Sequence, residues 1–85
     1  MTDKIIVYST AWCGDCRRAK KFLDERQIQY EDIDIDRTPE AAAIVKQLNN
    51  GNRSVPTIVF PDGTILVEPR TSQLAEKLGI AIGSN

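Results

Sequence analysis

Cys13 and Cys16, the two cysteines of this chain, are separated by two residues. A Cys-x-x-Cys pair where a strand leads into a helix is typical of a dithiol that cycles between reduced and disulfide forms. With Cys13 where the chain enters the helix and Cys16 one turn further in, the two side chains can reach disulfide distance without backbone movement. The unpaired N–H groups at the start of a helix stabilise a thiolate. The pattern therefore predicts Cys13 as the attacking thiol and Cys16 as the resolving thiol.

Two other interpretations of the cysteine pair stay open. Two buried structural cysteines would show the same spacing. A zinc site needs about four ligands, whereas the 85 residues include two cysteines and no histidine, so a second chain or an added thiol would have to complete it. The absence of histidine also excludes Cys–His and Ser–His–Asp chemistry. We therefore expect a redox dithiol without a metal site, in which local fields and hydrogen bonds activate the nucleophile.

The residues next to the cysteines are expected to tune them. Gly14 leaves the turn flexible, whereas Asp15 suits a first helical turn but opposes a nearby anionic sulfur. Over about 8 Å, with an effective dielectric of roughly 40–80, this repulsion is about 0.5–1 kcal/mol. A helix terminus contributes about 0.3–1 kcal/mol in the opposite direction. Arg17 and Arg18 are candidates to offset Asp15, with an ordinary solvated basic face of the helix as the alternative. Trp12 is expected at an exposed rim beside Cys13, where a flat apolar surface suits docking of a disulfide substrate.

Composition bounds the remaining function classes. With 41% hydrophobic and 27% charged residues, the chain is expected to form one domain over 1–82, followed by a tail at 83–85. Its net charge of −1 argues against non-specific nucleic-acid binding. The first apolar run is too short for a signal peptide or a membrane span. We expect a monomer in the cytoplasm. In such a reducing compartment, a close cysteine pair more often serves chemistry than structure.

Four strands are predicted from runs of apolar residues. The run at 4–8 is nearly continuous and rich in β-branched residues, as in a buried strand. The stretch at 30–36 alternates between isoleucine and aspartate, which indicates one buried face. Strands at 57–60 and 64–67 are joined by a Pro-Asp-Gly turn and should form a hairpin.

Three helices are predicted between and after these strands. The first covers about 13–27. The second has Thr38 as its N-cap hydroxyl and Pro39 at its first position, and the third is capped by Thr71 or Ser72. The order is therefore β-α-β-α-β-β-α. Because the first two strands flank a helix, they should be parallel, so the class is α/β, with a four-stranded mixed sheet and helices on both faces.

Four motifs together resemble the glutaredoxin family, and most closely its mycoredoxin branch. They are YSTAWCGDC at 8–16, DIDID at 32–36, NGNRSVPT at 50–57 and FPDGT at 60–64. The resemblance covers about residues 4–80. It implies a thioredoxin-like fold. It also implies that the proline matching Pro56 is cis and lies opposite the nucleophile, and that the backbone of Val55 binds the thiol or substrate.

The resemblance further implies a binding place for a small thiol. Residues at the start of the last helix usually hold its α-carboxylate, and Thr71 and Ser72 match that place, where a helix N-terminus suits an anion. Arg53 and Arg70 are candidate carboxylate clamps, with ordinary surface arginines as the alternative. The sequence departs from the family pattern at two places, and both belong to the thiol-binding groove that the resemblance implies. Gly-Asp replaces Pro-Tyr between the cysteines, and the stretch at 67–70 replaces Gly-Gly, which favours a thiol other than glutathione or a protein reductant.

The family implies a thiol–disulfide oxidoreductase that reduces protein disulfides or protein–small-thiol mixed disulfides. It implies no tightly bound cofactor, with mycothiol or glutathione as co-substrate. The expected partners are disulfide-containing proteins and the small thiol with its reductase. One alternative is a redoxin that a thioredoxin-reductase-like flavoprotein reduces and that donates electrons to ribonucleotide reductase or a peroxidase. Another is a dimer that carries a [2Fe–2S] cluster through one Cys13 per subunit and two small thiols.

Overall fold

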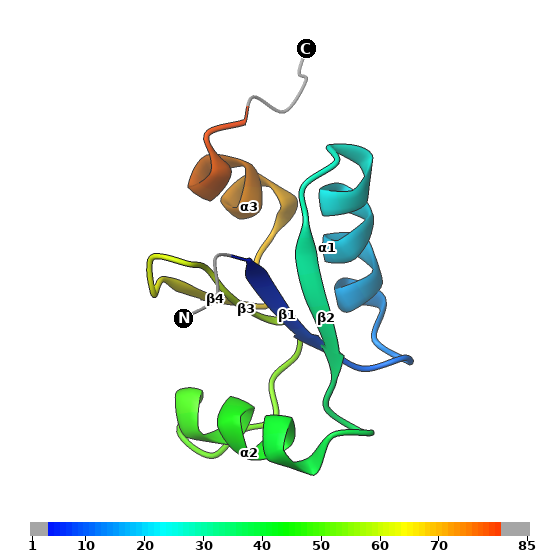
Figure 1. Cartoon of the computed structure of the whole chain (residues 1–85), viewed down its shortest axis with the longest axis vertical. Helices are drawn as coiled ribbons and strands as arrows, with labels where there is room; N and C mark the ends of the chain where they lie inside the picture. Colours follow the sequence, from blue (N-terminus) through cyan, green and yellow to red (C-terminus); the bar gives the residue numbers. More distant parts are fainter. Residues whose placement is uncertain (1–3, 81–85) are drawn as a thin grey trace.

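The protein is built on a four-stranded sheet in the order β2-β1-β3-β4 (Figure 1). The structure, a computed structural model, describes residues 4–80. The strands are β1 (Ile5–Ser9), β2 (Tyr30–Asp34), β3 (Thr57–Val59) and β4 (Ile65–Val67). β1 is parallel to β2 and antiparallel to β3, and β3 is antiparallel to β4. The predicted mixed sheet is confirmed, whereas the expected domain end at 82 and the tail at 83–85 lie outside the described residues.

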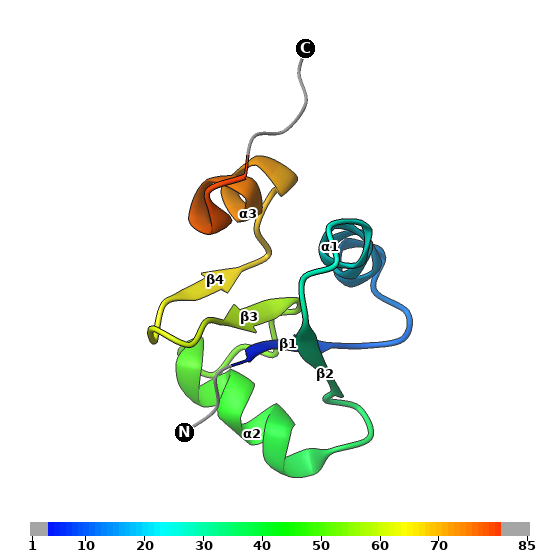
Figure 2. The same cartoon turned by 45° about the horizontal axis from the view of Figure 1, so that its top comes forward.

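Three helices complete the predicted order β-α-β-α-β-β-α. They are α1 (Gly14–Glu25), α2 (Pro39–Leu48) and α3 (Thr71–Leu78). α1 and α3 cover one face of the sheet and α2 covers the other (Figure 1, Figure 2). Among these helices of the described chain, none has the length and apolar character needed to cross a membrane.

Each face of the sheet has its own apolar core, because successive side chains of a strand point to opposite faces. The core under α1 and α3 consists of Ile5, Val7, Ala19, Phe22, Leu23, Ile58, Phe60, Leu74 and Ala75. The core under α2 consists of Tyr8, Ile35, Ala41 and Val45. The central strand β1 contributes to both cores, which explains why its sequence is a nearly continuous apolar run.

The first helix and the second strand are shorter than expected. α1 begins at Gly14, with Cys13 as its N-cap, and ends at Glu25. Gln27 has a left-handed backbone with φ of 58°, which does not continue a helix. β2 ends at Asp34, where the carboxylate of Asp34 accepts a hydrogen bond from the backbone N–H of Asp36 and starts a turn. The hairpin strands are likewise one residue shorter each.

One predicted helix cap has the expected position without the expected hydrogen bond, and the other was wrong. Thr38 occupies the N-cap position of α2, but its hydroxyl makes no capping hydrogen bond. The N-cap of α3 is Arg70, so Thr71 is the first helical residue instead of the cap. The side chain of Gln73 accepts a hydrogen bond from the backbone N–H of Arg70 at 2.7 Å, and this contact anchors the start of the helix.

The sheet topology brings two distant loops to one edge. β1 runs towards the loop that contains Cys13, and β3 starts directly after Pro56. Because β1 and β3 are antiparallel, with Tyr8 opposite Thr57, the end of one strand lies beside the start of the other. The same edge receives the segment after β4, since the backbone N–H of Glu68 donates to the carbonyl of Pro56 at 2.8 Å.

Candidate active site

Cys13 is held at the start of α1 by the helix backbone. Its own backbone is extended, with φ of −87° and ψ of 115°, which directs the side chain back over the first turn. The backbone N–H of Cys16 donates a hydrogen bond to Cys13 Sγ at 3.1 Å. A hydrogen bond to the charged form of an acid stabilises that form. The start of α1 therefore directs a backbone N–H at the Cys13 sulfur, and neither cysteine is in a disulfide.

The cis-proline loop lies on the other side of Cys13. The peptide bond between Val55 and Pro56 is cis, as the resemblance implies. The Cys13 thiol donates to the carbonyl oxygen of Val55 at 3.7 Å. The backbone of Val55 and the sulfur of Cys13 are therefore adjacent, although they are 42 residues apart in the chain. A substrate bound along Val55 would have its sulfur beside the nucleophile.

A groove of about 600 Å³ opens over this pair. Cys13 is only 9% exposed, but it forms part of the groove wall, so a substrate can approach it there. The wall consists of Trp12, Cys13, Gly14, Asp15, Asn52, Arg53, Ser54, Val55 and Glu68. The structure thus gathers half of the expected site residues into one groove.

Cys16 has different surroundings, because it is fully buried. Burial, with a smaller contribution from the hydrogen bond with Cys13, holds the pKa of the Cys16 thiol well above its ordinary value. The backbone of Thr10 and the charge of Lys20 act in the opposite direction on this pKa. Cys16 is therefore a neutral thiol at pH 7. This protonation state suits a resolving thiol, which reacts only after the attacking cysteine has formed a mixed disulfide.

Trp12 forms the exposed rim that the sequence predicts. Its side chain is 69% exposed, and its Nε1 donates a hydrogen bond to the Oδ2 of Asp36 at 2.9 Å. The other oxygen of Asp36 accepts from Nη2 of Arg53 at 2.6 Å. The hydrogen bonds from Arg53 and then from Trp12 lower the pKa of Asp36. Asp36 thus joins two groove residues, and it occupies Nη2 of Arg53, the candidate carboxylate clamp.

Of the two arginines expected to offset Asp15, Arg18 forms the ion pair and Arg17 does not. Arg18 forms an ion pair with Asp15 at 2.8 Å, in an exposed position one helical turn further on. Arg17 instead donates to the backbone carbonyl of Ala11 at 3.3 Å, which ties α1 to the Trp12 loop. Because residues three apart are neighbours on a helix, the spacing of Asp15 and Arg18 carried this signal.

The start of α3 lies outside the groove wall. Thr71 lines a separate hollow of about 270 Å³ together with Arg18, Phe22 and other residues of α1. From the segment between β4 and α3, Glu68 lines the groove instead. Small-thiol binding by Arg70, Thr71 and Ser72 stays a prediction.

Sequence reasoning missed four residues of the site. Asn52, Ser54 and Glu68 line the groove, and Asp36 braces its rim. Asn52 and Ser54 flank Arg53 in the motif NGNRSVPT, so that motif could have indicated them. Within residues 4–80, no three cysteine, aspartate or glutamate side chains gather in a way that could hold a metal ion.

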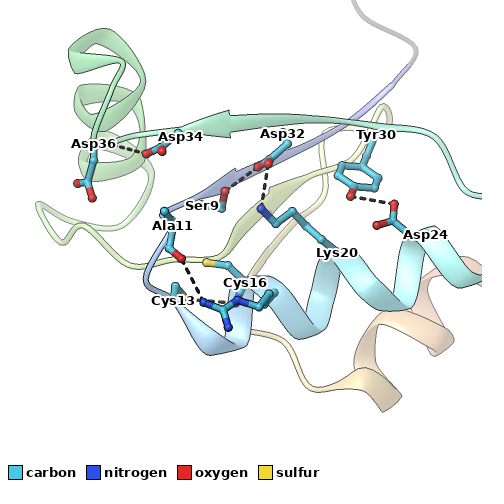
Figure 3. A network of polar contacts seen from close by, with 11 residues as sticks. Ser9, Ala11, Cys13, Cys16, Lys20, Asp24, Tyr30, Asp32, Asp34 and Asp36 are labelled. Atoms are coloured by element: carbon cyan, nitrogen blue, oxygen red, sulfur yellow. Dashed lines mark hydrogen bonds and ion pairs between the residues drawn. The ribbon is translucent and has the colours of Figure 1, made fainter.

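A charged network joins α1 to the sheet behind the cysteines (Figure 3). Lys20 Nζ donates to the Oδ2 of Asp32 at 2.9 Å, and the hydroxyl of Ser9 donates to the Oδ1 of the same residue at 2.6 Å. The three residues belong to α1, β2 and β1 respectively. Thr10, next to Ser9, is buried, and its hydroxyl has no hydrogen-bond partner within the described chain.

Comparisons with known proteins agree with this geometry. The family model described as Glutaredoxin matches residues 5–65. Mycoredoxin 1 of Corynebacterium glutamicum is 39% identical over 76 residues, which cover 89% of this chain and 94% of that protein. The glutaredoxin-like protein NrdH of Lactococcus lactis is 36% identical over 58 residues, covering 68% of this chain and 78% of that protein.

A solved structure extends the similarity to the fold. The crystal structure of a mutant thioredoxin-like protein matches this chain with a TM-score of 0.82 and 28% sequence identity. The match covers 94% of this chain and all of that one. The expected thioredoxin-like fold is therefore confirmed.

Proposed function

The chain belongs to the glutaredoxin family, and from that premise we propose that it reduces protein disulfides or protein–small-thiol mixed disulfides through Cys13 and Cys16. Members of this family are thiol–disulfide oxidoreductases. One observation carries the proposal. Cys13 lies at the N-cap of α1, accepts a backbone N–H, and opens onto a groove beside the carbonyl of Val55.

The reaction follows from the two environments of the cysteines. The Cys13 thiolate attacks one sulfur of the substrate disulfide, the substrate S–S bond breaks, and the other sulfur leaves with the electron pair and takes up a proton. Cys16 then attacks Cys13 Sγ, releases the second substrate sulfur as a thiol and leaves a Cys13–Cys16 disulfide. Alternatively, a small thiol resolves the mixed disulfide and Cys13 alone suffices.

For the reductant we propose a low-molecular-weight thiol, mycothiol or glutathione, in the cytoplasm. The relative named mycoredoxin 1 supports assignment to that branch. The groove offers Val55, Arg53 and the face of Trp12 as binding groups. No tightly bound cofactor is part of the proposal.

Turnover assays on mixed disulfides of one protein with glutathione, mycothiol and bacillithiol test this proposal. We expect wild-type protein to reduce at least one of them and Cys13→Ser to abolish the activity. In the Cys16→Ser variant, activity that survives on small-thiol mixed disulfides assigns the monothiol route, and complete loss assigns the dithiol route. Absence of activity in the wild type on all three substrates and on a protein disulfide would contradict the proposed function.

The similarity to the NrdH protein favours a second candidate, in which a thioredoxin-reductase-like flavoprotein supplies the electrons. NADPH consumption distinguishes the two routes. The chain is assayed once with the flavoprotein and once with the small thiol and its reductase. Consumption with the flavoprotein alone would assign the second route and reject the small thiol as reductant.

A further inference from the structure

The resolving step requires a proton to leave a fully buried thiol. Cys16 has no exposed surface, and burial favours the neutral form of a thiol. An attack on Cys13 Sγ requires the thiolate of Cys16. Groups close to Cys16 must therefore offset part of the cost of charging it.

Lys20 is positioned to provide this offset. It lies four residues after Cys16 on α1, and side chains with this spacing lie on the same helix face about 5–6 Å apart at Cβ. Its side chain is 23% exposed, because Asp32 draws the ammonium towards the sheet. Ser9 holds the Asp32 carboxylate from the neighbouring strand β1. Figure 3 shows the Lys20 side chain leaving α1 on the Cys16 side and ending at Asp32.

The charged groups around Cys16 come from three elements. α1 contributes Cys13 and Lys20, β2 contributes Asp32, and the loop after β1 contributes the backbone of Thr10. The charge of Lys20 lowers the pKa of Cys16, and the Thr10 backbone acts in the same direction. Cys13 acts in the opposite direction, but its charge is removed once it is bonded to a substrate sulfur. The effect of Lys20 is thus least opposed in the mixed disulfide, where the resolving step occurs.

We propose that Lys20, held by Asp32 and Ser9, is a positioning residue for the resolving step, and that its ammonium stabilises the Cys16 thiolate. The inference rests on the proposed function. In this step Cys16 loses a proton, its sulfur bonds to Cys13 Sγ, and the bond from Cys13 to the substrate sulfur breaks. The electron pair leaves with the substrate sulfur, which takes up a proton. No other oxidant or reductant is required.

Stopped-flow reaction of the reduced protein with dithiobis(nitrobenzoate) separates the two steps. The first coloured thiolate is released when Cys13 attacks, and the second when Cys16 resolves the mixed disulfide. We expect Lys20→Gln to slow the second phase about three- to tenfold, as loss of a unit charge about 6 Å away at an effective dielectric of roughly 40–80 implies. The midpoint of its pH profile should rise by about 0.5–1 pH unit. The first phase should be unchanged.

Three further variants make the test specific. Lys20→Arg keeps the charge and should retain the wild-type second phase. Lys20→Met keeps the aliphatic stem and should behave like Lys20→Gln, which provides a second charge-removing variant if the first fails to fold. Lys21→Gln removes the same charge from the next, exposed residue and should leave both phases unchanged.

The outcomes separate this inference from the proposed function. A second phase in Lys20→Gln and Lys20→Met that equals that of Lys21→Gln in rate and pH profile would overturn the role of Lys20 alone. A wild-type protein whose Cys13 reacts no faster than an ordinary thiol would contradict the proposed function itself.

Discussion

At the scale of single residues, the two cysteines differ in their surroundings far more than in their positions. Cys13 lies on a groove wall and accepts a backbone N–H, whereas Cys16 is fully buried in the first turn of the same helix. Burial penalises a charged sulfur, and a hydrogen bond from a helix N–H favours it. In the proposed reaction, the same side-chain type therefore serves as the nucleophile at one position and as the resolving group at the other.

Asp15 allows a direct test of the electrostatics at Cys13. We predict that Asp15→Asn raises the rate of Cys13 alkylation at pH 7 about two- to fivefold, because it removes about 0.5–1 kcal/mol of repulsion. The Cys13–Cys16 pair should also become more oxidising, since a more stable thiolate favours the reduced form. Iodoacetamide labelling in a Cys16→Ser background measures the rate. Glu76→Gln, which changes the net charge equally on α3, is the control, and an unchanged or lower rate in Asp15→Asn would contradict the prediction.

At the scale of elements, α1 both presents the cysteines and anchors itself in the core. Its exposed end carries the N-cap sulfur, while Phe22 and Leu23 pack against the sheet. The guanidinium of Arg26 lies 3.9 Å from the centre of the Phe22 ring and covers it from the solvent side. A helix fixed in this way holds its first turn, and thus Cys13, at a constant place beside Val55.

The packing of α1 predicts a large effect of truncating Leu23. Leu23→Ala removes buried methyl groups and leaves a cavity, so we expect a loss of about 2–5 kcal/mol in the free energy of unfolding. Urea denaturation followed by circular dichroism measures it. Leu48→Ala, the same substitution at a position on α2 that is 40% exposed, should lose less than half as much. Equal losses would show that the core under α1 does not support the fold as described.

At the scale of the whole molecule, the sheet separates two ends with different tasks. The groove lies at the end of the sheet where β1 finishes and β3 begins. Tyr30, at the start of β2, pairs with Ile5 at the start of β1 and therefore lies at the opposite end of the sheet. There the Tyr30 hydroxyl donates to the Oδ1 of Asp24 at 2.9 Å and ties β2 to α1. This contact stabilises the fold without touching the reacting sulfurs.

The Tyr30 contact predicts a pH dependence of stability. Burial, followed by the hydrogen bond to Asp24, raises the pKa of Tyr30 to about 12, from an ordinary value of 10.0. Because the folded protein holds this proton more tightly than the unfolded chain, the contribution is fully present below about pH 10 and is lost as the pH rises towards about 12. Tyr30→Phe should therefore reduce the decline of stability over this window. Urea unfolding of both proteins at pH 7, 9, 10 and 11 checks this, and parallel curves would contradict it.

Local patterns in the chain were sufficient to predict the order of helices and strands and the position of the cysteine pair at the start of a helix. Alternation at 30–36 and the apolar run at 4–8 predict strands because side-chain period and burial depend on near neighbours. Element ends were less accurate. Thr38 is an N-cap without a capping hydrogen bond, and Thr71 is not a cap, because cap geometry depends on backbone angles and on partners such as Gln73, which a residue type does not reveal.

The sequence by itself determined the order of elements, the cysteine pair and its place at a helix start, because these depend on residues a few positions apart. Only the tertiary structure decided that Glu68 shares a groove with Cys13, that Asp36 holds Arg53, and that Lys20 reaches Asp32. Each of these contacts joins residues at least twelve positions apart. Strand pairing and helix packing bring such residues into contact, and no local sequence pattern predicts contacts between residues so far apart in the chain.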